Sequence, residues 1–370
     1  MEASLQIGKI MGIPVRLHWS FLVVVLYVAW AFASVSEPIL GKAYGFGAVE
    51  PVTLRWAYSL FFAILLFICV GVHELGHSYI AKSYGISIKS ITLYFFGGVA
   101  SMEEIPRDPK MELKMALVGP LVSGALGFFS ILFYWEAMLL VGPMHPVPIL
   151  LWTLGVMNLI LMAFNLLPAF PMDGGRVLRA WFAARMPYVI ATRRAANVGK
   201  MFAVFMGILG LFSFNFILLF VAFFIYIGAS EEEKATAIDI SLKGIKVRNI
   251  MSSNVRTIPP DMTLKGLMDM MFQEKHRGYP VVEEGKLQGI VTLTDLQRVP
   301  DLQRDATYVR DVMTRNLFVI GPEEEASTAM RTMSEKGIRR LPVMNEGSLM
   351  GIVSREDLVR VIELCQLKPY

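Results

Sequence analysis

One short pattern in the chain could do chemistry: residues 73–77 read His-Glu-Leu-Gly-His, which has the form HExxH. Histidines four residues apart on a helix lie on one face and can bind one Zn²⁺ through their imidazole nitrogens. Glu74, between them, then lies beside the metal position and can accept a proton from water. A pattern of only five residues can also occur by chance. In that case these side chains would be the polar end of a helix near the lipid headgroups.

A third metal ligand is predicted in the segment NLLPAFPMDGG, residues 165–175. Two prolines break a helix there, two glycines permit a tight turn, and Asp173 is the one carboxylate of the region. Irregular backbone at membrane depth is tolerated where it lines a cavity or is buried in protein. We therefore expect Asp173 to join His73 and His77, which leaves a fourth position for water. The alternative is that Asp173 caps a helix in an interfacial loop.

These groups are expected inside a membrane, because the two parts of the chain differ in charge. Residues 1–240 carry 16 Lys and Arg and 14 Asp and Glu, whereas residues 241–370 carry 19 and 17. The first part is too apolar for a soluble domain, and the second has ordinary globular composition. This excludes a single soluble domain, a disordered chain and a basic nucleic-acid-binding protein. The two cysteines, Cys69 and Cys365, form neither a disulfide framework nor a metal motif.

About six membrane spans are predicted, since a span needs about 20 apolar residues. The apolar runs cover residues 17–34, 56–72, 115–141, 147–170 and 201–228, and the last is divided by a turn near residues 212–215. With the N-terminus inside, the inner segments hold 14 Lys and Arg and the outer segments hold two, Lys42 and Arg55. This bias predicts a multi-pass protein of the cell membrane with both the N-terminus and the C-terminal part cytoplasmic. The first run is read as a retained helix and not as a signal peptide.

Residues 87–101 are rich in β-branched and aromatic side chains and contain the pair Gly97-Gly98. They are predicted to form strands at the cytoplasmic edge of the site. A free strand edge could hold a substrate in extended form, and the alternative is a simple hairpin at the membrane surface.

The HExxH and NLLPAFPMDGG segments, with the Phe96-Gly97-Gly98 segment between them, resemble the site-2 protease family of intramembrane zinc metalloproteases. The resemblance covers about residues 1–230, and it is to the branch with a C-terminal CBS pair. It implies that His73, His77 and Asp173 are zinc ligands and that Glu74 is the general base. By the same resemblance, Asn165 helps to hold the substrate or its oxyanion, although it could instead bond a backbone carbonyl.

The C-terminal part is an internal repeat with a shift of 62 residues and no gap. For example, GIVTLTD at residues 289–295 aligns with GIVSRED at residues 351–357. Two copies are too few for a solenoid, so they should pack as one pseudo-symmetric unit. The repeat resembles a tandem CBS pair, with copies at about residues 246–300 and 308–367. The expected domains are therefore a transmembrane protease domain, 1–238, and a soluble α/β CBS pair, 246–367.

The CBS resemblance also implies a ligand, because in that family the Ser or Thr and the Asp of this motif contact an adenosine ribose or phosphate. The corresponding residues, Thr292, Asp295, Ser354 and Asp357, are expected contacts for ATP or AMP. A carboxylate can accept from two ribose hydroxyls, and a hydroxyl can donate to a phosphate oxygen. Alternatively these residues cap the helix that follows, and the pair serves to form homo-oligomers.

The predicted function is an intramembrane zinc endopeptidase that cleaves membrane-spanning or membrane-tethered proteins near the cytoplasmic face. Adenine nucleotide bound to the CBS pair would regulate it. The expected partners are a membrane protein substrate and the lipid bilayer, without nucleic acid. The alternative is a CBS-regulated transporter or channel whose histidines and carboxylates form an ion site. A pore, however, has no need of a glutamate between two histidines on one helical face.

Overall fold

The computed structural model describes the chain except for residues 1–3, 37, 95–96, 103–105, 143–144 and 367–370. Contacts between Cα atoms divide it into two compact units, Met1–Lys234 and Ala235–Tyr370. The domain limits 1–238 and 246–367 remain predictions.

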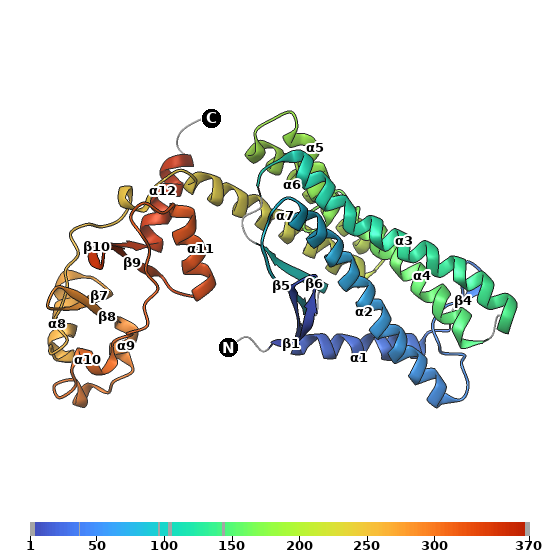
Figure 1. The fold of residues 1–370 in the computed structure, drawn as a ribbon, viewed down its shortest axis with the longest axis horizontal. Helices are drawn as coiled ribbons and strands as arrows, with labels where there is room; N and C mark the ends of the chain where they lie inside the picture. The colour runs from blue at the N-terminus through green and yellow to red at the C-terminus, as the bar shows by residue number, and fades with distance from the viewer. Residues whose placement is uncertain (1–3, 37, 95–96, 103–105, 143–144, 367–370) are drawn as a thin grey trace. The chain divides into compact units, whose positions relative to one another are not determined.

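The first unit is built around long apolar helices. Within the described residues, four helices are long and apolar enough to cross a membrane. These are α2 (Val52–Ser83), α3 (Pro109–Val141), α4 (Pro146–Asn165) and α6 (Tyr188–Phe212). Figure 1 shows α2, α3 and α4 running side by side, and α3 packs against both of its neighbours. Large apolar side chains such as Phe128 and Leu139 are exposed on these helices, as lipid-facing positions would be.

Three further helices complete this part of the chain: α1 (Trp19–Ser34), α5 (Asp173–Ala183) and α7 (Phe216–Leu242). The expected turn divides α6 from α7 between Phe212 and Phe216. α7 starts apolar but reaches three glutamates at residues 231–233. The first predicted span began too early, at Leu17, because Leu17 and His18 belong to a strand. His18 then caps α1 by accepting a hydrogen bond from the backbone of Ser20.

A four-stranded sheet in the order β1-β2-β5-β6 lies against α1 and α2. Its strands are β1 (Ser4–Ile10), β2 (Ile13–His18), β5 (Ile88–Tyr94) and β6 (Gly97–Met102). β5 and β6 are the strands predicted within residues 87–101, and they pair with each other as an antiparallel hairpin. β2 pairs with β5 in parallel. The N-terminal hairpin β1-β2 was not predicted. A separate two-stranded ribbon joins β3 (Pro38–Ile39) to β4 (Lys42–Ala43).

The second unit contains the repeat, and its elements recur at the predicted shift of 62 residues. Helix α8 (Leu264–Glu274) corresponds to α11 (Ala326–Lys336). The hairpin of β7 (Gly278–Glu283) and β8 (Lys286–Thr292) corresponds to the hairpin of β9 (Arg340–Asn345) and β10 (Ser348–Ser354). Each hairpin leads into a helix, α9 (Leu293–Gln297) or α12 (Arg355–Gln366). Short helical turns open or join the copies: η1 (Val247–Asn249), η2 (Asp301–Gln303) and α10 (Val309–Val312).

The two copies also exchange matching contacts. The isolated bridges Ser252–Ile352 and Ile290–Thr314 are the same pairing with the roles of the copies reversed. This exchange is the mark of a pseudo-two-fold axis that relates the two copies.

Residues 239–245, which lie between the two expected domains, do not form an extended linker. α7 continues to Leu242, and the Leu242 side chain is buried in the core of the second repeat with Val247, Leu341 and Leu358. The composition of this segment is polar enough to suggest a linker, but Ile238 and Leu242 lie one helical turn apart and pack on the same core.

Candidate metal centre

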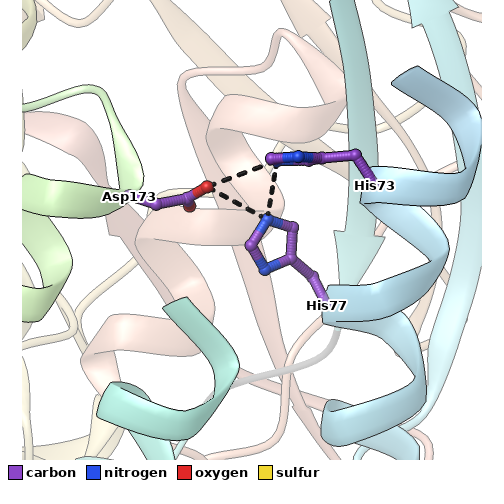
Figure 2. Close-up of side chains that lie close together, drawn as sticks. All are labelled: His73, His77 and Asp173. Carbon is purple, nitrogen blue, oxygen red and sulfur yellow. Dashed lines mark hydrogen bonds and ion pairs between the residues drawn. The ribbon is translucent and has the colours of Figure 1, made fainter. Parts of the chain in front are cut away.

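The structure brings His73, His77 and Asp173 together in the first unit (Figure 2). The Nε2 atoms of the two histidines lie 3.1 Å apart. The Oδ2 atom of Asp173 lies 3.3 Å from Nε2 of His73 and 3.2 Å from Nε2 of His77. These distances show that the three donor atoms converge on one point. All three residues are buried, so this point lies within the protein.

The local sequence explains why these atoms meet. His73 and His77 are one helical turn apart on α2, and Figure 2 shows both side chains pointing from that helix toward Asp173. Asp173 is the first residue of α5, after the irregular segment that follows α4. Met172, and not Asp173, is the capping residue of α5, and its side chain makes no capping hydrogen bond. The Asp173 carboxylate faces the histidines.

Helix α3 orients both imidazole rings from behind. The Nδ1 atom of His73 lies 2.9 Å from the Oγ atom of Ser123, and the Nδ1 atom of His77 lies 2.7 Å from the carbonyl oxygen of Met115. A carbonyl accepts only, so Nδ1 of His77 carries the proton and its Nε2 offers a lone pair. Such partners are typical of metal-binding histidines.

Gly119 completes this surface of α3. A Cβ atom at position 119 would lie 2.2 Å from Nε2 of His77 and 2.7 Å from Nε2 of His73. Residues 115, 119 and 123 are spaced by one helical turn and share a face. Their role at the site was not predicted from the sequence, although the small residues Gly119 and Ser123 at that spacing were the available signal.

The donor set fits zinc. Donors bound tetrahedrally at about 2.0 Å lie about 3.3 Å from one another, and the three separations here are 3.1, 3.3 and 3.2 Å. Two imidazole nitrogens and a carboxylate are zinc ligands in catalytic sites. The other nitrogen of each ring also has a hydrogen-bond partner, as is usual for zinc-binding histidines. Three ligands leave one coordination position for water or substrate.

Glu74 lies on α2, and its side chain points toward the sheet. A Cβ atom built on Gly98 would come within 2.4 Å of the Cγ atom of Glu74, so the glutamate side chain packs directly on the backbone of β6. β6 pairs with β5 on one side and is the end strand in the order of the described sheet. The potential base therefore lies on the face of the strand that ends the described sheet.

Glycines let other backbone segments approach the loop of residues 166–172. A Cβ on Gly174 would lie 2.2 Å from the carbonyl oxygen of Leu167, and one on Gly175 would lie 2.6 Å from the nitrogen of Phe170. Neither glycine has a positive φ angle, because both belong to α5. The expectation that they serve a tight turn was therefore wrong: they are small so that α5 can fold back onto its own loop.

Asn165, the last residue of α4, bonds to its own helix. Its Nδ2 atom donates to the carbonyl oxygen of Leu161 at 3.0 Å. The residue is partly buried, and its role with a substrate remains a prediction.

In the second unit, both expected Ser/Thr and Asp pairs cap helices. The Oγ1 atom of Thr292 and the Oγ atom of Ser354 each donate at 2.6 Å to a carboxylate oxygen, of Asp295 and Asp357 respectively. Ser354 and Asp357 also line a pocket of about 380 Å³. Its lining also includes five basic residues that were not predicted as ligand contacts: Arg256, Lys275, His276, Arg277 and Arg340.

That pocket concentrates positive charge. Burial, partly offset by Glu356 and reinforced by Arg277 and Arg339, lowers the pKa of the Arg340 guanidinium. Arg340 donates to the carbonyl oxygen of Gly278 at 3.2 Å. Burial and a hydrogen bond to Glu274 raise the pKa of Tyr279 to about 12, so this phenol keeps its proton at neutral pH.

A buried cluster of two histidines and an aspartate in a unit of long apolar helices is the arrangement expected of a membrane-embedded metalloenzyme. Family models match the same regions: peptidase family M50 at residues 61–141 and 143–210, and the CBS domain at residues 247–301 and 309–364.

Known relatives match over the whole chain. A zinc metalloprotease of Methanocaldococcus jannaschii is 37% identical over 372 residues, which cover 100% of this chain and 98% of that protein. A protein of Mycobacterium tuberculosis named putative zinc metalloprotease Rip3 is 31% identical, with coverage of 99% and 95%. A solved site-2 protease structure from M. jannaschii is 38% identical and aligns with 62% of this chain and 95% of that one, with a TM-score of 0.43.

The chain belongs to peptidase family M50, the site-2 proteases, and carries two CBS domains. It is a multi-pass membrane zinc metalloprotease, and the alternative of a transporter or channel is set aside.

Proposed function

We propose that the protein cleaves membrane-spanning or membrane-tethered proteins at a zinc site near the cytoplasmic face of the cell membrane. The observation that carries the proposal is the convergence of three buried donors beside a glutamate and a strand edge. His73, His77 and Asp173 would hold the metal. Bound Zn²⁺ supplies Lewis acidity, which acidifies water and polarises a carbonyl group.

Glu74 performs the proton transfers. It accepts a proton from the attacking water while the water oxygen bonds to the scissile carbonyl carbon. It then donates a proton to the amide nitrogen as the C–N bond breaks, so that a free amine leaves. Its place on the backbone of β6, at Gly98, puts the base next to any chain bound along that strand.

The edge of β6 would hold the substrate as an added strand. A peptide bond in a transmembrane helix is shielded by the surrounding helix, whereas an extended chain exposes it. Pairing with β6 supplies the backbone hydrogen bonds that the substrate loses when its helix unwinds. Asn165 would contribute to holding the substrate or its oxyanion, once its amide leaves the carbonyl of Leu161.

The decisive experiment uses the purified full-length protein, single-span substrates in detergent and three proteins: wild type, Glu74→Gln and Glu136→Gln. Glu136 is an exposed glutamate on α3 and serves as the matched control. We expect wild type and Glu136→Gln to cleave and to hold one zinc each, and Glu74→Gln to hold zinc without cleaving. Full activity of Glu74→Gln would remove the glutamate from the mechanism. Wild-type cleavage that survives complete zinc removal would overturn the metal assignment.

We also propose that the CBS pair binds ATP or AMP and thereby changes the cleavage rate. The pocket lined by Ser354 and Asp357 supports this, because it places a carboxylate that can accept from ribose near several cations that can pair with phosphate. Any effect on rate requires different affinity for two states of the enzyme.

The repeat indicates that the two halves of the CBS pair are not equivalent. At the positions that correspond by the 62-residue shift, Phe318 stands for Arg256, Ile338 for His276 and Gly337 for Lys275. The half that contains Thr292 and Asp295 therefore lacks much of the positive charge, so we expect the half with Asp357 to bind a phosphorylated nucleotide more tightly.

Titration calorimetry with ATP and AMP tests this. Asp357→Asn and Arg277→Gln should lose nucleotide binding, whereas Asp295→Asn should weaken it less and Arg315→Gln, an exposed arginine outside the pocket, should not. Thermal melts identify variants that have merely lost a helix cap. Cleavage rates indifferent to millimolar nucleotide would leave the CBS pair as an oligomerisation or docking module.

A further inference from the structure

An ion-pair network centred on Arg179 joins three helices of the protease unit: α3, α5 and α7. Arg179 on α5 donates through Nε to a carboxylate oxygen of Glu112 on α3 at 2.7 Å, and its Nη2 lies 2.6 Å from the same oxygen. Its Nη1 donates to Glu232 on α7 at 2.5 Å. Arg179 and Glu112 are both buried, and Glu232 is partly exposed. The guanidinium thus connects one carboxylate in the core with one nearer the surface.

Each partner belongs to an element that bears on the metal site. α5 begins at Asp173, six residues before Arg179. α3 carries Glu112 one turn before Met115, whose carbonyl orients His77. The Arg179–Glu112 pair therefore ties the helix of the carboxylate ligand to the helix that orients the histidines. The rigid fork of Arg can bridge two carboxylates at once, which a Lys ammonium at the same place would do poorly.

The third partner comes from the helix that leaves the protease unit. Glu232 lies on α7, and the next residue, Glu233, pairs with Lys200 of α6 at 2.6 Å. α7 continues beyond Lys234 to Leu242, whose side chain is buried in the core of the second repeat. A buried ion pair is weak evidence for stability alone, but it does specify geometry.

We propose that Arg179 and Glu232 are positioning residues, which hold α5 in the register that places the Asp173 carboxylate against His73 and His77. The inference rests on the proposed role of these three residues as zinc ligands. Neither positioning residue touches the reacting atoms, so they would act through Asp173.

Glu232→Gln is the informative variant. It removes the negative charge that α7 contributes to this network. The buried Arg179–Glu112 pair stays intact, so the protein should fold. Glu231→Gln is the matched control, because Glu231 neighbours Glu232 on α7 and pairs with Lys234 at the surface. Arg179→Lys keeps a charge beside Glu112 but would bridge poorly to Glu232. Full-length protein in detergent is used throughout.

Zinc affinity is measured by competition with a chelator. We expect Glu232→Gln and Arg179→Lys each to raise the zinc dissociation constant several-fold, less than the roughly 10–100-fold that follows loss of a group bonded directly to a metal ligand. The double variant should be no worse than the weaker-binding single variant, because both changes break one connection. Glu231→Gln should bind zinc as wild type does. Equal zinc affinity in all four variants would overturn the proposal.

Hydrogen exchange of the metal-free protein gives a readout that requires neither zinc nor activity. In Glu232→Gln, amides of residues 169–177 should exchange at least several-fold faster, while those of α4 and the CBS unit are unchanged. Uniformly faster exchange would indicate a merely structural role and would also overturn the proposal. If wild-type protein bound no zinc, the proposed function would fail, and the exchange of residues 169–177 would still decide whether the network positions α5.

Discussion

The Nδ1 atom of His73 lies 2.9 Å from the Oγ atom of Ser123, a residue fifty positions later on a different helix. This contact makes α3 part of the proposed metal centre, although α3 provides none of the three donor atoms. It also holds the His73 ring so that its Nε2 atom faces Asp173.

Ser123→Ala should therefore weaken zinc binding without unfolding the protein. The change leaves a buried ring nitrogen without its partner, and loss of such an outer-shell contact costs about 10–100-fold in metal affinity. Chelator competition measures this directly. Ser130→Ala, seven residues further along α3, is the control and should bind zinc normally. A wild-type affinity in Ser123→Ala would show that the hydroxyl has no part in orienting the ring.

Gly119→Ala should abolish zinc binding. The added methyl group would occupy the space 2.2 Å from Nε2 of His77, where the two histidines must present their lone pairs. Gly71→Ala is the matched control, since a Cβ at Gly71 on α2 would meet nothing within 4 Å. Zinc content by elemental analysis distinguishes the two variants. Stoichiometric zinc in Gly119→Ala would mean that the donors meet elsewhere.

Gly98→Ala should separate metal binding from catalysis. Its methyl group would come within 2.4 Å of the Glu74 Cγ atom and displace the proposed base, while the three donors stay in place. We expect normal zinc content and at least a 100-fold loss of cleavage, in line with the typical contribution of a general base. Gly8→Ala, in the same sheet with open space around it, should cleave normally. An active Gly98→Ala enzyme would argue against Glu74 as the base.

Topology can be tested by cysteine labelling in intact cells, with Cys365→Ser as background because Cys69 is buried. A cysteine in place of the exposed His145 should react with an impermeant reagent from outside, and one in place of the exposed Glu283 should react only after lysis. The asymmetry of Lys and Arg between the two sides is the reason. External labelling at position 283 would place the CBS pair outside and separate it from cytoplasmic nucleotide.

Much of this architecture could be predicted because it depends on local periodicity. HExxH places two histidines on one face of any helix. Apolar length predicted about six spans, and four helices of the described residues are long and apolar enough to cross a membrane. The 62-residue repeat predicted elements that recur in the structure at that spacing. The N-terminal hairpin was not predicted, because Leu17 and His18 adjoin an apolar run and match the start of a helix as well as the end of a strand.

The sequence by itself determined the residue types of the proposed metal centre, since the donors His73, His77 and Asp173 stand in recognisable patterns. Only the tertiary structure decided how they meet and what supports them. The roles of Ser123, Gly119 and Gly98 were not predicted from the sequence, because they depend on helices and strands that pack at distances of a few ångströms. The Arg179 network is likewise invisible in the sequence, because its charges are distant along the chain and meet only when α3, α5 and α7 pack together.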